Sequence, residues 1–120
     1  MEEQRNFSRI KFKAYTQVEI QSHPFGGELL DISLNGALIS FDQILPLKLD
    51  EDVIVKVFLP SSSISLSFKA LLVHLEENRY GFKFKSCDAE SMTHLRKLLE
   101  YNLDDQEKVV RELFFLQKSS

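Results

Sequence analysis

Short runs in which every second residue is apolar constrain the fold of this chain more than any other feature. One such run covers residues 12–20 and a longer one covers residues 64–74. A period of two places successive side chains on opposite faces of a strand, so each run predicts a strand with one buried face. Residues 53–59 are β-branched and aromatic, and residues 80–84 alternate with aromatic side chains, which predicts two further strands.

Turn-forming residues separate these runs. Pro24, Gly26 and Gly27 predict a turn over residues 22–27. Asn35 and Gly36 lie between two apolar runs, and an Asn-Gly pair in this setting predicts a tight hairpin turn. The strands on either side of these turns bring the expected total to about six.

The apolar period changes to three and four residues after Cys87, which predicts a helix, and Asp104 is a plausible N-cap for a second one. Strands followed by helices argue against a βαβ nucleotide-binding fold. We therefore expect a mainly β protein: a six-stranded antiparallel barrel of split or Greek-key type, with a flexible N-terminal arm and C-terminal α-helices. The expected single domain, 1–120, divides into an arm (1–10), a barrel (11–87) and helices (88–118).

Charge and cysteine content narrow the function classes. The formal net charge is -3, which opposes a general DNA- or RNA-binding role. Cys87 is the single cysteine, so no intrachain disulfide can form and a reducing cytoplasm is expected. The polar N-terminus lacks the pattern of a signal peptide. No apolar run reaches membrane-spanning length, so no membrane insertion is expected.

The N-terminal arm carries an RxxxR string formed by Arg5 and Arg9. Side chains four residues apart point to the same side in an extended chain and are neighbours on a helix, so both guanidinium groups can reach one ligand. A guanidinium fork matches a phosphate or the O6/N7 edge of guanine. The other interpretation is a solvated basic N-terminus.

A second string, DxSxxG, is formed by Asp31, Ser33 and Gly36. Asp31 and Ser33 share a face if both lie on a strand, and a carboxylate can accept hydrogen bonds from the N1–H and N2 amino group of guanine. Gly36 permits a positive φ and a close approach of ligand to backbone. The other interpretation is a hairpin in which Asp31 and Ser33 bond the local backbone.

The order and spacing of the two strings resemble the signature of PilZ domains, which are bacterial receptors for the second messenger cyclic di-GMP. The glycine and aromatic residues at 80–84 and the helical pattern after residue 88 are similar to the last strand and C-terminal helices of stand-alone members. The resemblance implies the following ligand-binding residues: Arg5, Arg9, Asp31, Ser33 and Gly36, with Gln4, Asn6 and His74 as further candidates.

Two features depart from the family pattern. Gln4 and Asn6 stand where many members carry additional arginines beside the arm's first arginine. Fewer cations weaken the case for a stacked pair of ligand molecules, which brings four phosphate charges, so the expected ligand is either one molecule or a stacked pair. His74 lies near a strand end, where some similar proteins place a tryptophan that stacks on guanine. It is either a stacking residue or a histidine at the pocket rim.

Nothing in the sequence indicates catalysis. His23, His74 and His94 lack metal-ligand spacing, Cys87 has no CxxC partner, and no Walker or GxSxG motif is present. We expect neither an enzyme nor a resident cofactor or metal. The expected function is a cytoplasmic cyclic di-GMP receptor that changes conformation and signals to an unidentified protein partner. The alternatives are a PilZ-like protein-interaction adaptor that binds no nucleotide and a small barrel that binds single-stranded nucleic acid.

Overall fold

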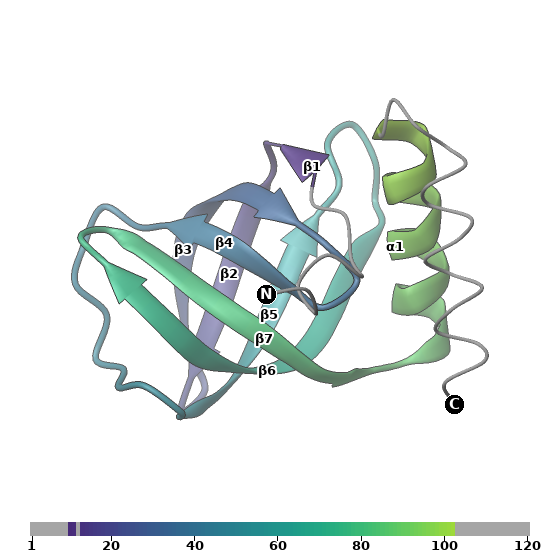
Figure 1. The fold of residues 1–120 in the computed structure, drawn as a ribbon. Helices are drawn as coiled ribbons and strands as arrows, with labels where there is room; N and C mark the ends of the chain where they lie inside the picture. Colours follow the sequence, from purple (N-terminus) through teal and green to yellow (C-terminus); the bar gives the residue numbers. More distant parts are fainter. Residues whose placement is uncertain (1–9, 12, 103–120) are drawn as a thin grey trace, which may run out of the picture.

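The computed structural model describes residues 10, 11 and 13–102 (Figure 1). The residues of the expected arm up to Arg9, and the second helix expected from Asp104, lie outside the described residues. The described elements are β1 (Ile10–Lys11), β2 (Tyr15–Ile20), β3 (His23–Ile32), β4 (Gly36–Ser40), β5 (Asp52–Phe58), β6 (Ser65–Glu76), β7 (Arg79–Cys87) and α1 (Ala89–Asn102).

Strands β2 to β7 form a closed antiparallel barrel, as the sequence predicted. The pairing order is β3-β2-β5-β6-β7-β4, and the ring closes because β4 also pairs with β3. The short strand β1 adds to β3 outside this ring (Figure 1). Closure leaves the barrel strands with hydrogen-bonding neighbours on both sides, which removes most exposed sheet edges.

The core follows the period of two that the sequence shows. In β2 the buried side chains are Thr16, Val18 and Ile20, and their neighbours face outward. Strands β5 and β6 repeat this pattern over most of their length. Each strand therefore has one face for the barrel interior and one face for the outside, where a ligand can reach it.

Helix α1 lies along one end of the barrel (Figure 1). Its apolar side chains Leu95 and Leu99 are 0% and 1% exposed, so they complete the core at that end. Asp88 accepts a hydrogen bond from the Ser91 N–H at 2.8 Å, which caps the helix, and this bond lowers the pKa of Asp88. The Ser91 hydroxyl in turn accepts a hydrogen bond from Ser67 N–H at 3.0 Å and ties α1 to β6.

The turn predicted over residues 22–27 is wrong, because residues from His23 onward belong to β3. The turn is instead formed by Gln21 and Ser22, whose φ angles are 53° and 72°. Gly26 and Gly27 lie within the strand, where a side chain at either position would meet neighbouring atoms. These glycines therefore permit close packing inside a sheet. In the sequence alone, a glycine that permits close packing cannot be distinguished from one that forms a turn.

The contact between α1 and the barrel predicts the effect of truncating one helix side chain. Leu95→Ala removes a fully buried side chain and should lower the free energy of unfolding by about 2–5 kcal/mol. Leu49→Ala makes the same truncation at a side chain that is 56% exposed, and should change stability by less than about 0.5 kcal/mol. Urea unfolding followed by circular dichroism measures both. Equal losses in the two variants would contradict the packing of α1 on the core.

Candidate functional site

A β-bulge in β3 turns Asp31 to the outside of the barrel. The register shifts between Leu29 and Asp31, so that Leu30 and Asp31 together oppose Leu38 of β4. Leu29 and Ile32 are both fully buried, although a regular strand would turn residues three apart to opposite faces. The extra residue resolves this conflict and leaves Asp31 on the outer surface, half-buried.

Strand pairing then places Asp31 in a continuous row of residues across the barrel. Lys11 of β1 opposes Asp31, and Asp31 opposes Leu38. Leu38 opposes Gly81 of β7, and Gly81 opposes His74 of β6. Asp31 and His74 are thus three strand spacings apart, about 14 Å at roughly 4.8 Å for each spacing. Residues that are 43 positions apart in the sequence therefore belong to one outer surface.

Ser33 has a different environment from Asp31. It lies one residue beyond the end of β3 and is fully buried. Its hydroxyl accepts a hydrogen bond from the Asn35 N–H at 3.0 Å, and its own N–H donates to the Gly36 carbonyl at 2.9 Å. Ser33 therefore fixes the shape of the turn from below the surface, as in the local-backbone interpretation.

The hairpin predicted around Asn35 and Gly36 is confirmed, because β3 pairs with β4, but Gly36 is the first residue of β4 and residues 33–35 form the connection. None of the described glycines has a positive φ. Glycine is required here because a side-chain carbon would overlap the carbonyl oxygen of Phe82 on β7. Its contribution to the site is the close approach of β4 to β7 beside the turn.

A hollow of about 320 Å³ lies on the outer surface along this row. His74 contributes an exposed imidazole whose Nε2 is 3.6 Å from the carboxylate of Glu76. Gly81 has no side chain, so the surface is lowered between Leu38 and His74. The lining residues are Asn35, Gly36, Ala37, Leu38, Val73, His74, Gly81, Phe82 and Lys83.

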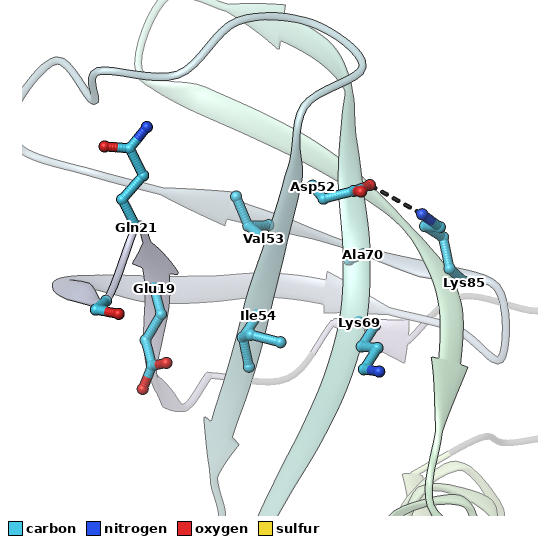
Figure 2. Close-up of a pocket in the computed structure, with 9 residues that line it drawn as sticks. Glu19, Gln21, Asp52, Val53, Ile54, Lys69, Ala70 and Lys85 are labelled. Carbon is cyan, nitrogen blue, oxygen red and sulfur yellow. Dashed lines mark hydrogen bonds and ion pairs between the residues drawn. The ribbon is translucent and has the colours of Figure 1, made fainter.

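A second hollow of about the same volume, 320 Å³, lies over β2, β5 and β6 and differs in charge (Figure 2). Its lining includes the carboxylates of Glu19 and Asp52. Asp52 pairs with Lys85 at 2.9 Å, and Glu19 pairs with Lys56 at 3.0 Å. Among the residues that the structure describes, none that lines the first hollow carries a carboxylate, so this hollow is the better site for an anion.

Among the predicted site residues, the structure brings Asp31, Gly36 and His74 to one face and places Ser33 beneath it. Arg5, Arg9, Gln4 and Asn6 lie outside the described residues. The described chain begins at Ile10, whose strand partner Ile32 lies between Asp31 and Ser33 in the sequence. The RxxxR string thus immediately precedes, in the sequence, a residue that is paired with β3, the strand that carries Asp31.

Sequence reasoning missed Lys83 and Gly81 as site residues. The alternation over residues 80–84 is enough to turn Lys83 outward, since Tyr80 and Phe82 are buried. No sequence pattern shows that Lys83 lies opposite Gly36 or that Gly81 lies opposite His74. These two relations depend on the register of β7 with its two neighbours.

Other reactive groups give little indication of chemistry in the described part of the chain. Residues 10, 11 and 13–102 contain no cluster of three or more His, Cys, Asp or Glu side chains able to hold a metal ion. Burial raises the pKa of the Cys87 thiol, with the nearby Asp88 carboxylate adding to the effect, so the thiol stays protonated near neutral pH. Within the same residues, no helix is both long and apolar enough to cross a membrane.

Comparison with known proteins identifies the family of this chain. The family model described as "PilZ domain" matches residues 3–101, so the chain belongs to the PilZ domain family. The match includes the RxxxR string, the barrel and nearly all of α1.

Solved PilZ structures share the fold at low sequence identity. The PilZ domain of Escherichia coli YcgR with c-di-GMP is 17% identical, with a TM-score of 0.68 over 80% of this chain and 88% of that one. The PilZ domain of CeSA from a cellulose-synthesizing bacterium is 18% identical, with a TM-score of 0.59 over 92% and 98%. Bacillus subtilis MotI/DgrA, an inhibitor of motility, is 14% identical, with a TM-score of 0.67 over 80% of this chain and 47% of that protein. The present chain therefore spans about half the length of MotI.

The close approach at Gly36 predicts a stability difference between two glycine substitutions. Gly36→Ala places a carbon against the backbone of Phe82, which cannot rotate away, and should lower the free energy of unfolding by about 2–3 kcal/mol. In Gly26→Ala, the new carbon meets mainly the hydroxyl of Tyr15, at 2.7 Å, on a side chain that is 54% exposed and can move. Thermal unfolding of both variants measures the difference. A Gly36→Ala protein as stable as Gly26→Ala would contradict the tight β4–β7 contact.

Proposed function

We propose that this protein is a cyclic di-GMP receptor whose binding face is the outer surface around Asp31. The observation that carries the proposal is the strand register that aligns Asp31 with Lys11, Leu38, Gly81 and His74. Membership of the PilZ family supports it, as does the similar fold of YcgR, which has been solved with c-di-GMP.

The chemistry of the face suits a guanine nucleotide. In the proposal, the Asp31 carboxylate accepts hydrogen bonds from the N1–H and N2 amino group of a guanine. The imidazole of His74, exposed beside Gly81, offers a stacking surface for a base. Ser33 and Gly36 act indirectly, because they hold the turn and the β4–β7 contact that shape the surface.

The RxxxR arm supplies the charge in this proposal. Arg5 and Arg9 grip phosphate and guanine edges as the arm folds over the ligand, with Gln4 and Asn6 as neutral polar neighbours. Ordering the arm costs about 1–2 kcal/mol for each backbone residue, and each charge-assisted hydrogen bond returns about 1.5–3 kcal/mol. Several such bonds must form together, so binding is sensitive to the loss of any one arginine.

The proposed role is binding and signalling rather than catalysis, with cyclic di-GMP as a ligand and not a resident cofactor. Arm closure changes the charge of the surface beside Asp31, and a protein partner recognises the changed surface. A cytoplasmic location, predicted from the single cysteine, belongs to the same proposal.

A protein-interaction adaptor that binds no nucleotide is the second candidate. The structural similarity to MotI, an inhibitor of motility, favours it. Both candidates require a partner protein, and they differ in whether cyclic di-GMP is needed for that contact.

Isothermal titration calorimetry with cyclic di-GMP tests the proposal. Wild type should bind with a dissociation constant of about 1 μM or below, corresponding to about -8 kcal/mol. Arg5→Ala, Arg9→Ala and Asp31→Ala should each weaken binding at least about tenfold, because each removes a charged partner. The molar ratio at saturation distinguishes one bound molecule from a stacked pair.

Asp42→Ala is the matched control for Asp31→Ala, because it removes an exposed carboxylate from the connection after β4. Its affinity should equal that of wild type. A folded wild-type protein that gives no heat with cyclic di-GMP would reject the receptor and leave the adaptor as the function.

A further inference from the structure

Lys83 occupies a position on β7 that the two signature strings do not include. It opposes Gly36 of β4 on one side and Leu71 of β6 on the other. Phe82 is buried, whereas Lys83 is exposed and lines the hollow that also contains His74 and Gly81. The ammonium group therefore belongs to the same surface as the DxSxxG turn.

The positive charge of the Lys83 ammonium group can pair with an anion that binds from outside. In the part of the chain that the structure describes, no carboxylate lies within 4.0 Å of its ammonium group, and none lines the hollow. Lys85, the next outward cation on β7, is instead held by Asp52 at 2.9 Å (Figure 2). Lys83 is thus the one lysine that lines this hollow, and it has no competing ion pair among the described residues.

We propose that Lys83 binds a phosphate of the ligand, so that the barrel itself contributes a phosphate contact beside the arm. This inference rests on the proposed function and adds to it a residue that neither string contains. A lysine ammonium is a point charge on a flexible stem, and it suits a phosphate whose orientation is set by other contacts.

The spacing along β7 is consistent with one nucleotide of the ligand. Lys83 lies two residues from Gly81, about 7 Å along the strand. A base stacked at Gly81 and His74 would therefore have its phosphate within reach of the Lys83 side chain. The arm residues Gln4 and Asn6 are neutral, so the lysine supplies positive charge that these two positions do not.

Calorimetry of three lysine variants with cyclic di-GMP tests this inference. Lys83→Gln should weaken binding about 10- to 100-fold, the effect of losing one charge-assisted hydrogen bond. Its affinity should also fall less steeply between low and high salt, because one ionic contact is gone. Lys83→Arg keeps the charge and should recover most of the affinity.

Lys69→Gln is the matched control. Lys69 is also exposed, also lies on the outer face, and lines the other hollow (Figure 2). Lys69→Gln changes the net charge by the same amount as Lys83→Gln, so a general electrostatic effect on affinity would appear equally in both variants. Similar thermal unfolding of the lysine variants confirms that the fold is intact.

The outcomes separate this inference from the proposed function. If wild type binds and Lys83→Gln binds equally well, Lys83 is not a phosphate ligand and the receptor function stands. If Lys69→Gln and Lys83→Gln lose the same affinity, the effect is long-range charge and the specific contact is rejected. If wild type does not bind at all, both the receptor and the role of Lys83 are rejected.

Discussion

The pairing of β3 with β4 is the contact on which both the fold and the face depend. It closes the barrel, and it also contains the bulge at Leu30 and Asp31. The bulge satisfies two demands that a regular strand cannot meet together, since Leu29 and Ile32 must both reach the core while Asp31 remains outside. The strand that seals the hydrophobic interior is therefore the same strand that presents the candidate ligand-binding carboxylate.

Two glycines shape the face by leaving space rather than by turning the chain. At Gly36 the missing side chain lets β4 approach the backbone of Phe82, and at Gly81 it leaves the surface low beside His74. Ser33 holds the intervening turn through its hydrogen bonds with Asn35 and Gly36. In the DxSxxG string, Asp31 therefore faces the outside, whereas Ser33 and Gly36 support its position from the turn and from the β4–β7 contact.

Charge distribution separates the two hollows of the barrel surface more clearly than size does. They have about the same volume, 320 Å³, but within the described part of the chain one is lined by two carboxylates and the other by none. A protein with a net charge of -3 can still attract an anionic ligand if its acidic groups are paired or placed elsewhere. In the second hollow, over β2, β5 and β6, the carboxylates of Asp52 and Glu19 are paired in this way with Lys85 and Lys56.

The sequence by itself determined the β barrel, the helix after Cys87 and the two signature strings, because period-two burial and local motifs are properties of neighbouring residues. It misplaced the turns at residues 22–27 and 35–36, since glycine serves both turns and close packing. Only the tertiary structure placed Lys83 opposite Gly36 and His74 in the row of Asp31. Those relations come from strand register, which is set by pairing between distant segments and by a bulge that changes which face each residue occupies.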